Sequence, residues 1–143
     1  MENLTLDTFK EKVCECGLGS SGGDAKWQYK GSVPAVIDFY ADWCGPCKMV
    51  SPILEQLSKE YEGRLNIYKV NTETEPQLAG AFGITSIPSI LFIPLEGQPQ
   101  MSAGAMPKQQ LKQLFREVLG VEESVNQTDR GGVPTASSAS QNR

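Results

Sequence analysis

The 143-residue sequence predicts an α/β sandwich in which helices cover a central β-sheet, and three observations support this fold class. Segments with strand and helix patterns alternate along the chain. Residues 33–41 (VPAVIDFYA) form a continuous apolar run of strand length, which is typical of a strand buried on both faces of a parallel or mixed sheet. An apolar fraction of 39% and a charged fraction of 21% indicate a globular chain with the size of one domain.

The N-terminal part combines a short helix with a glycine-rich segment. Asp7 is expected to cap a helix over residues 8–13. Residues 14–32 include five glycines and are expected to form a flexible insertion. Trp27 and Tyr29 lie in this insertion, and we expect their side chains to hold it against the body of the domain.

The strand at 33–41 is followed by further alternating elements. A helix is expected after Cys44 and Cys47, with a kink at Pro52 and its end at Gly63. Its apolar residues recur at helical spacing, and they are Met49, Val50, Ile53, Leu54, Leu57 and Tyr61. We then expect a strand over 64–70, a short helix over 75–82, a strand over 89–93, an edge strand over 100–103 and a helix from Pro107. Residues 1–120 are predicted to form one domain, and the polar segment 121–143 a disordered tail.

Composition excludes several classes of function. A net charge of −4 argues against a protein that grips nucleic-acid phosphates. The chain has no histidine, which removes His-based triads and imidazole acid–base catalysis. The longest strongly apolar stretch, 87–95, is much shorter than the about 20 residues of a membrane-spanning helix. With no signal-peptide pattern, we expect a cytoplasmic protein, or alternatively the mature form of a periplasmic or exported one.

Cys44 and Cys47 enclose Gly45-Pro46 between the predicted strand 33–41 and the following helix. Cys44 is thereby placed at a helix N-terminus, where free N–H groups and the helix dipole favour an anion. The thiolate is the reactive form, and the pKa of such a thiol typically falls from about 8.5 to about 3.5–7.5. Cys47 lies within disulfide reach and is placed to attack a mixed disulfide formed on Cys44.

The cysteines also allow other interpretations. A Cys-x-x-Cys pair can be half of a zinc site, with Cys14 and Cys16 as the other half. It can also be a purely structural disulfide. The alternative function is therefore a metal-binding or redox-sensing interaction module that uses Cys14, Cys16, Cys44 and Cys47.

Asp38 interrupts the apolar run 33–41, where a carboxylate is costly to bury. Burial raises the pKa of a carboxyl group and makes it an acid or base near neutral pH. The alternative is a strand-end carboxylate that meets solvent or a cation. Lys69, in the neighbouring predicted strand, is a candidate partner for Asp38 or an ordinary strand lysine.

Several segments together resemble the thioredoxin family. The resemblance rests on Trp43-Cys44-Gly45-Pro46-Cys47-Lys48, preceded by Val36-Ile37-Asp38-Phe39-Tyr40-Ala41, and continues through Pro52, Lys69, Gly83-Ile84, Ile87-Pro88 and Gly104-Ala105. It covers residues 33–119 and, more loosely, 3–13. It implies a thioredoxin fold, with a central mixed β-sheet flanked by helices on both faces.

The resemblance implies roles for single residues. Cys44 is expected to be the nucleophile and Cys47 the resolving cysteine. Asp38 is expected to take the proton from Cys47, with Lys69 tuning the Asp38 carboxylate. The peptide bond before Pro88 is expected to be cis, and Pro88 is expected to face the cysteines. A shallow apolar surface that docks the substrate is implied for Trp43, Gly45, Pro46, Gly83, Ile84, Ile87, Pro88, Gly104 and Ala105.

The implied activity is that of a protein-disulfide reductase that acts on disulfides in client proteins. A thioredoxin reductase or another separate donor is expected to supply the electrons, and no bound cofactor or metal is expected. We expect a monomer with no nucleic-acid or membrane partner. A role mainly as a subunit or scaffold of another enzyme is a further alternative.

Three features depart from the family pattern. Tyr40 stands where the family commonly has a tryptophan, and the segment 14–32 is longer and richer in glycine. Cys14 and Cys16 are not part of the family motif. These two cysteines can close a strained disulfide of their own, and we expect an accessory or incidental role for them.

Overall fold

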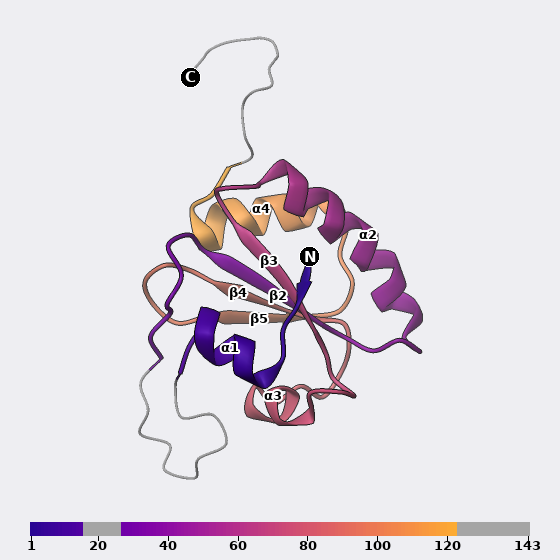
Figure 1. The fold of residues 1–143 in the computed structure, drawn as a ribbon. Coiled ribbons are helices and arrows are strands. Elements are labelled where there is room, and N and C mark those ends of the chain that lie inside the picture. Colours follow the sequence, from indigo (N-terminus) through magenta and orange to yellow (C-terminus); the bar gives the residue numbers. More distant parts are fainter. Residues whose placement is uncertain (16–26, 123–143) are drawn as a thin grey trace, which may run out of the picture.

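A computed structural model describes residues 1–15 and 27–122 of the chain. Within these residues five strands form one sheet in the order β1-β3-β2-β4-β5 (Figure 1). The strands are β1 (Glu2–Asn3), β2 (Ala35–Tyr40), β3 (Asn66–Asn71), β4 (Ser89–Ile93) and β5 (Gln100–Ala103). Strands β1, β3 and β2 are parallel, whereas β4 is antiparallel to β2 and β5 to β4, so the sheet is mixed as predicted.

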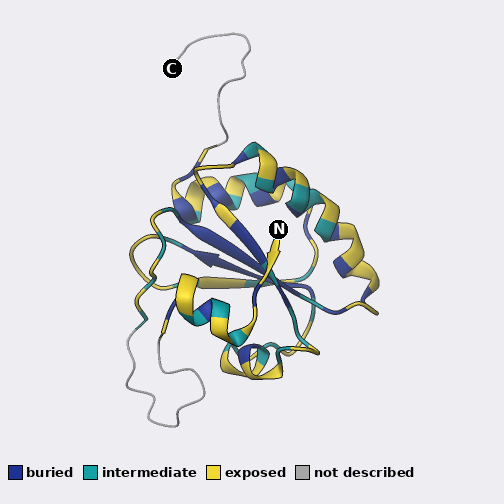
Figure 2. Cartoon of the chain, in the orientation of Figure 1, coloured by how far each residue is buried: buried dark blue, intermediate teal, exposed yellow. Residues whose placement is uncertain are grey.

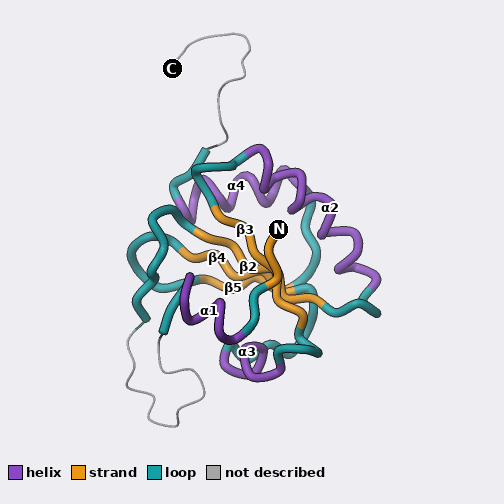
Figure 3. The backbone as a smooth tube through the Cα atoms, viewed as in Figure 1, coloured by secondary structure: helices purple, strands orange, loops and turns teal. Residues whose placement is uncertain are grey.

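Helices cover both faces of this sheet. They are α1 (Leu6–Lys12), α2 (Gly45–Glu60), α3 (Pro76–Ala81) and α4 (Lys108–Leu119). Helices α2 and α4 lie on one side of the sheet and α1 and α3 on the other (Figures 1 and 3). The predicted fold class is therefore confirmed. No helix in the described part of the chain has the length and apolarity that crossing a bilayer requires.

Two hydrophobic clusters separate the sheet from its helices, and the central strands are almost wholly buried (Figure 2). Side chains alternate across the faces of β2. Val36 packs in the cluster beneath α2 and α4, whereas Ile37 and Phe39 pack in the cluster beneath α1 and α3. Asp38 shares the face of Val36, so its carboxylate lies on the α2 side of the sheet.

Helix α1 begins one residue before Asp7, and Thr5 is its N-cap. The Thr5 side chain accepts a hydrogen bond from the Thr8 backbone N–H at 3.2 Å, and the Thr8 hydroxyl oxygen accepts one from the Thr5 N–H at 2.8 Å. This reciprocal pair satisfies two backbone donors at once, which Asp7 as a cap would not do. Asp7 instead lies in the first turn, where its charge complements the helix dipole.

Helix α2 is continuous through Pro52 and ends at Glu60, before Gly63. It buries Val50, Leu54 and Leu57 against the sheet. Met49, one of the apolar residues noted at helical spacing, has a side chain that is 71% exposed. Successive helical residues are about 100° apart, so the neighbour of a buried Val50 points away from the core.

The C-terminal end of the domain extends past residue 120. Gly120 adopts a left-handed conformation (φ 68°) that turns the chain back, and the Val121 N–H donates to the Phe115 carbonyl at 3.1 Å. Val121 is buried, and the Arg64 guanidinium donates to the Glu122 carbonyl. The first two residues of the predicted tail therefore belong to the folded domain. Residues 123–143 lie outside the described residues.

The described part of the glycine-rich insertion packs against the body. Trp27 and Tyr29 contact the cluster beneath α1 and α3, and the Trp27 ring lies edge-on to Phe82 at 6.3 Å. The Tyr29 hydroxyl donates to the Val33 carbonyl at 2.6 Å. The predicted anchoring by these two aromatic side chains is confirmed. Residues 16–26, which include Cys16 and four of the five glycines, lie outside the described residues.

Candidate active site

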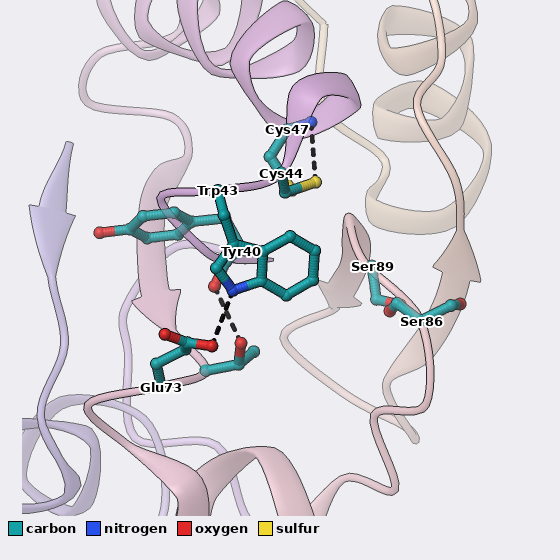
Figure 4. Close-up of a disulfide and its surroundings, with 8 residues drawn as sticks. Tyr40, Trp43, Cys44, Cys47, Glu73, Ser86 and Ser89 are labelled. Carbon is teal, nitrogen blue, oxygen red and sulfur yellow. Dashed lines mark hydrogen bonds between the residues drawn. A yellow bond between two sulfur atoms is a disulfide. The ribbon is translucent and has the colours of Figure 1, made fainter.

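A disulfide joins Cys44 and Cys47 at the start of α2, with their Cα atoms 5.3 Å apart. Cys44 is the N-cap residue, and Pro46 lies in the first helical turn, where a missing N–H costs no hydrogen bond. The Cys47 N–H donates to the Cys44 sulfur at 3.2 Å (Figure 4). The first N–H groups of a helix have no partners within the helix, so this donor remains available to stabilise a Cys44 thiolate after reduction.

Both cysteines are buried, and they form a small cluster with Ala41, against which the side chains of Tyr40 and Ile87 pack. The adjacent Gly45 and Pro46 are exposed. The disulfide therefore lies just below an exposed loop.

The segment around Ile87 brings a second loop to the disulfide. The Ile87–Pro88 peptide bond is cis, as the family resemblance implies. The Gly104 N–H donates to the Pro88 carbonyl at 2.7 Å, so the Gly104-Ala105 pair lies next to Pro88. The Ser89 hydroxyl donates to the Ser86 carbonyl at 2.7 Å and closes the turn that precedes β4 (Figure 4).

Trp43 is 68% exposed and is fixed by a residue that the sequence analysis did not single out. Its indole Nε1–H donates to the Glu73 carboxylate at 2.7 Å (Figure 4). Glu73 is itself oriented because its N–H donates to the Asn71 side chain at 2.8 Å. The carboxyl ends of parallel strands meet at one edge of a sheet. An acidic turn directly after β3 was therefore a usable signal.

Asp38 is 1% exposed, and neither of its carboxylate oxygens has a hydrogen-bond partner among the described residues. Burial raises the pKa of this carboxyl group from 3.8 to about 7, and the nearby positive charge of Lys69 lowers it in part. Desolvation thus outweighs attraction. The predicted buried carboxyl group is present, on the face of β2 that α2 covers.

Lys69 occupies the partner position of Asp38 on the parallel strand β3. Partner residues on neighbouring strands point to the same face of a sheet, so both side chains lie on the α2 side. The Lys69 ammonium lies 5.6 Å from the centre of the Tyr40 ring, in a cation–π arrangement. Tyr40, the residue that departs from the family pattern, thus contacts both the disulfide cluster and Lys69.

The remaining predicted docking residues do not all pack against the Cys44–Cys47 cluster. Gly83 is exposed with a left-handed backbone (φ 63°). Ile84 packs against the cluster beneath α1 and α3 rather than against the cysteines. The structure brings Ile87 to the disulfide and joins Pro88 to Gly104, and it holds Gly83-Ile84 at the loop that follows α3.

The cysteines outside the motif form no metal site with it in the part of the chain that the structure describes. Cys14 is buried beneath α1 and α3, away from the Cys44–Cys47 cluster, and it is disulfide-bonded. No three Cys, Asp or Glu side chains within residues 1–15 and 27–122 converge as metal ligands. Cys16 lies outside these ranges.

One glycine pattern bears on cofactor binding. Gly17, Gly19 and Gly22 have the spacing of the dinucleotide-binding fingerprint GxGxxG. In nucleotide-binding domains that fingerprint directly follows a strand. Here the three glycines come after α1 in the chain and lie outside the described residues.

Comparisons with known proteins agree with this geometry. Residues 26–117 match the thioredoxin family. A thioredoxin of Borreliella burgdorferi is 46% identical over 118 residues, which are 82% of this chain and 97% of that protein. Thioredoxin 1 of a Nostoc species is 41% identical over 116 residues, or 81% of this chain and 94% of that protein.

A solved structure gives the same fold. Chloroplastic thioredoxin z superposes with a TM-score of 0.66 over 82% of this chain and 93% of its own, at 22% identity. Three observations point to the same family. They are the fold, the Cys-Gly-Pro-Cys disulfide at a helix N-terminus, and the relatives that match over nearly their full length. The chain belongs to the thioredoxin family and is a protein thiol–disulfide oxidoreductase.

Proposed function

We propose that this protein reduces disulfides in client proteins, with Cys44 as the nucleophile and Cys47 as the resolving thiol. The observation that carries the proposal is the position of Cys44 as the N-cap of α2, with the Cys47 N–H directed at its sulfur. A helix N-terminus favours the thiolate, which is the attacking species in disulfide exchange.

The first step forms a mixed disulfide. The Cys44 thiolate attacks one sulfur of the client disulfide, the client S–S bond breaks, and the second client sulfur leaves as a thiolate that takes a proton from solvent. Trp43, Gly45, Pro46, Gly83, Ile84, Ile87, Pro88, Gly104 and Ala105 dock the client. The exposed Gly45, Pro46 and Trp43 around the buried cysteines support this role.

The second step releases the client. Asp38 takes the proton of the Cys47 thiol, and the Cys47 thiolate attacks the Cys44 sulfur. The mixed disulfide breaks, the Cys44–Cys47 disulfide forms, and the other client sulfur leaves as a thiolate that is then protonated. The client has gained two electrons and two protons in total. A carboxyl group with a pKa of about 7 is suited to this proton transfer at neutral pH, and Lys69 keeps that pKa from rising further.

Membership in the thioredoxin family implies client proteins with disulfides and a reductase as partners. We propose that a separate reductase returns two electrons to the oxidised pair and that no cofactor is bound to this chain. We propose that the protein acts as a monomer. We place the cycle in the cytoplasm, where thiols are kept reduced; cell fractionation tests this location against an exported form.

Insulin reduction tests the proposal. With dithiothreitol as the electron donor, the wild-type protein is expected to accelerate insulin reduction and precipitation of the B chain, and Cys44→Ser to abolish this acceleration. Cys47→Ser is expected to accumulate a covalent complex with insulin, because the first step proceeds and the second cannot. Turnover by Cys44→Ser at the wild-type rate would refute the assignment of the nucleophile.

A further inference from the structure

An apolar pocket of about 390 Å³ opens beside the active site, and of its lining residues only Ala105 has a role in the cycle described above. We call it the Met49 pocket. Helix α2 contributes Met49, Val50 and Ile53, and the segment between β5 and α4 contributes Ala105, Met106 and Pro107. All six lining side chains are apolar. Met49, at the rim, is 71% exposed and is one of four large hydrophobic side chains exposed in the described part of the chain.

We propose that the Met49 pocket binds a large apolar side chain of the client, located two residues from the cysteine that Cys44 attacks. The proposal rests on the proposed function, since it assumes a client chain lying across Cys44. It adds a specificity rule to that function, namely a preference for clients with Leu, Ile, Met or Phe at this position.

The spacing along α2 sets the distance between cysteine and pocket. A helix rises 1.5 Å per residue, so Val50 lies about 4.5 Å along the axis from Cys47 and about 9 Å from Cys44. An extended client advances about 3.3 Å per residue, and side chains two residues apart point the same way. A side chain two residues from the reacting cysteine is therefore about 6.6 Å from it, close to the about 7.5 Å of helix axis between Cys44 and the rim residue Met49, whereas its immediate neighbours point to the other side.

The pocket is continuous with the loops around the disulfide. Ala105 lines it, and the N–H of the adjacent Gly104 donates to the Pro88 carbonyl. Pro88 follows Ile87, whose side chain packs against the disulfide. A client that reaches Cys44 over Ile87 thus meets the pocket without leaving the surface. This continuity identifies the occupant as the client itself.

The lining determines which side chains are accepted. The pocket offers no charge and no side-chain hydrogen-bond donor, so a charged or amide side chain would be desolvated without compensation. Methionine side chains are flexible and polarisable, and they adapt to apolar groups of different shape. Met49 and Met106 therefore suit a reductase that accepts several apolar residues rather than one.

The test uses two disulfide-linked peptides of identical composition. One carries the core Leu-Gly-Cys-Gly-Leu and the other Gly-Leu-Cys-Leu-Gly, so the leucines move by one position on both sides of the cysteine. Prereduced protein is mixed with each peptide, and acid-quenched samples are separated to give second-order rate constants. We expect the first peptide to react about three to ten times faster, as partial burial of one leucine side chain would give.

Two matched variants locate the preference. Met49→Gln is expected to remove most of the difference between the peptides while leaving the reduction of glutathione disulfide, which has no leucine, unchanged. Met101→Gln is the control, because Met101 is also exposed but pairs with Leu91, whose side chain is buried on the opposite face of the sheet. It is expected to retain the full preference.

The outcomes separate this inference from the proposed function. Equal rates for the two peptides, or a preference that survives Met49→Gln, overturn the pocket assignment while disulfide reduction stands. If neither peptide nor insulin is reduced, the proposed function fails and the inference fails with it. Concentration-dependent dimerisation that Met49→Gln abolishes would assign the pocket to a second copy of the chain and would also overturn the inference.

Discussion

Asp38 and Lys69 are partner residues on the parallel strands β2 and β3, yet both carboxylate oxygens of Asp38 lack a hydrogen-bond partner among the described residues. Because Asp38 accepts no hydrogen bond from these residues, burial raises its pKa by more than the positive charge of Lys69 lowers it. The result is a buried acid with a pKa of about 7 beneath the helix that carries the disulfide.

The stability of the oxidised protein is expected to decrease as the pH rises because of Asp38. Its pKa in the fold, about 7, lies above the ordinary value of 3.8. Between these values the folded chain holds a proton that the unfolded chain has lost, so the free energy of unfolding falls from about pH 4 to 7 and stays lowered above. A shift of about three units corresponds to about 4 kcal/mol.

Urea unfolding of Asp38→Asn across this pH range checks the prediction. The variant is expected to lose most of the slope between pH 4 and 7 and to exceed the wild-type stability at pH 8 by about 2–4 kcal/mol. An unchanged slope would show that Asp38 titrates with an ordinary pKa.

Removal of the Lys69 charge is expected to raise the pKa of Asp38 further. The lysine is the attractive charge that opposes desolvation, so Lys69→Met leaves burial uncompensated. A carboxyl carbon NMR titration should show the Asp38 midpoint above that of the wild type, and the pH at which insulin reduction reaches half of its maximum should move upward with it. Lys69→Arg, which keeps the charge, is the control. A midpoint that stays in place would mean that the two side chains do not interact.

The Trp43–Glu73 hydrogen bond is expected to fix the exposed indole beside the cysteines. Glu73→Ala removes the acceptor, and we expect the Trp43 Nε1 proton to exchange faster with solvent and its NMR signal to shift. Glu73→Gln keeps an acceptor oxygen and should retain most of the protection. Similar exchange rates in all three proteins would show that the bond does not persist in solution.

Gly31 is expected to be intolerant of a side chain. A Cβ atom at this position would overlap the hydroxyl and ring of Tyr29, whose hydroxyl is held by the Val33 carbonyl. Gly31→Ala is therefore expected to lower the free energy of unfolding by about 1–3 kcal/mol. Gly80→Ala is the matched control, since Gly80 lies in α3 with open space around it, and it is expected to raise stability by about 0.5–1 kcal/mol. Chemical denaturation that ranked the two variants in the opposite order would contradict this packing.

Strong local signals account for the elements that could be predicted from sequence. Strand β4 follows Pro88, and β5 follows a turn at residues 96–99. Proline and turn residues therefore marked where these strands begin. The burial of Asp38 could be predicted because the residues around it are continuously apolar. The Cys44–Cys47 pair could be predicted as redox-active because the two cysteines enclose Gly-Pro between a predicted strand and a predicted helix.

Features that depend on neighbours in space could not be predicted in the same way. Asp7 was the predicted cap, and the reciprocal hydrogen bonds between Thr5 and Thr8 place the cap two residues earlier. Glu73 acts on Trp43 across 30 residues of chain, so the acidic turn after β3 becomes a signal only once β2 and β3 are known to end side by side. Val121 is one apolar residue after a glycine, and its burial depends on the turn that Gly120 makes.

The proposed cycle depends most directly on the ionisation of Cys44 in the reduced protein. Alkylation by iodoacetamide over a range of pH, resolved for each cysteine by peptide mass spectrometry, measures it. We predict a midpoint for Cys44 within about 3.5–7.5, well below the about 8.5 of a free cysteine, and a return to the free value when urea unfolds α2. A midpoint near 8.5 in the folded protein would contradict the proposed nucleophile.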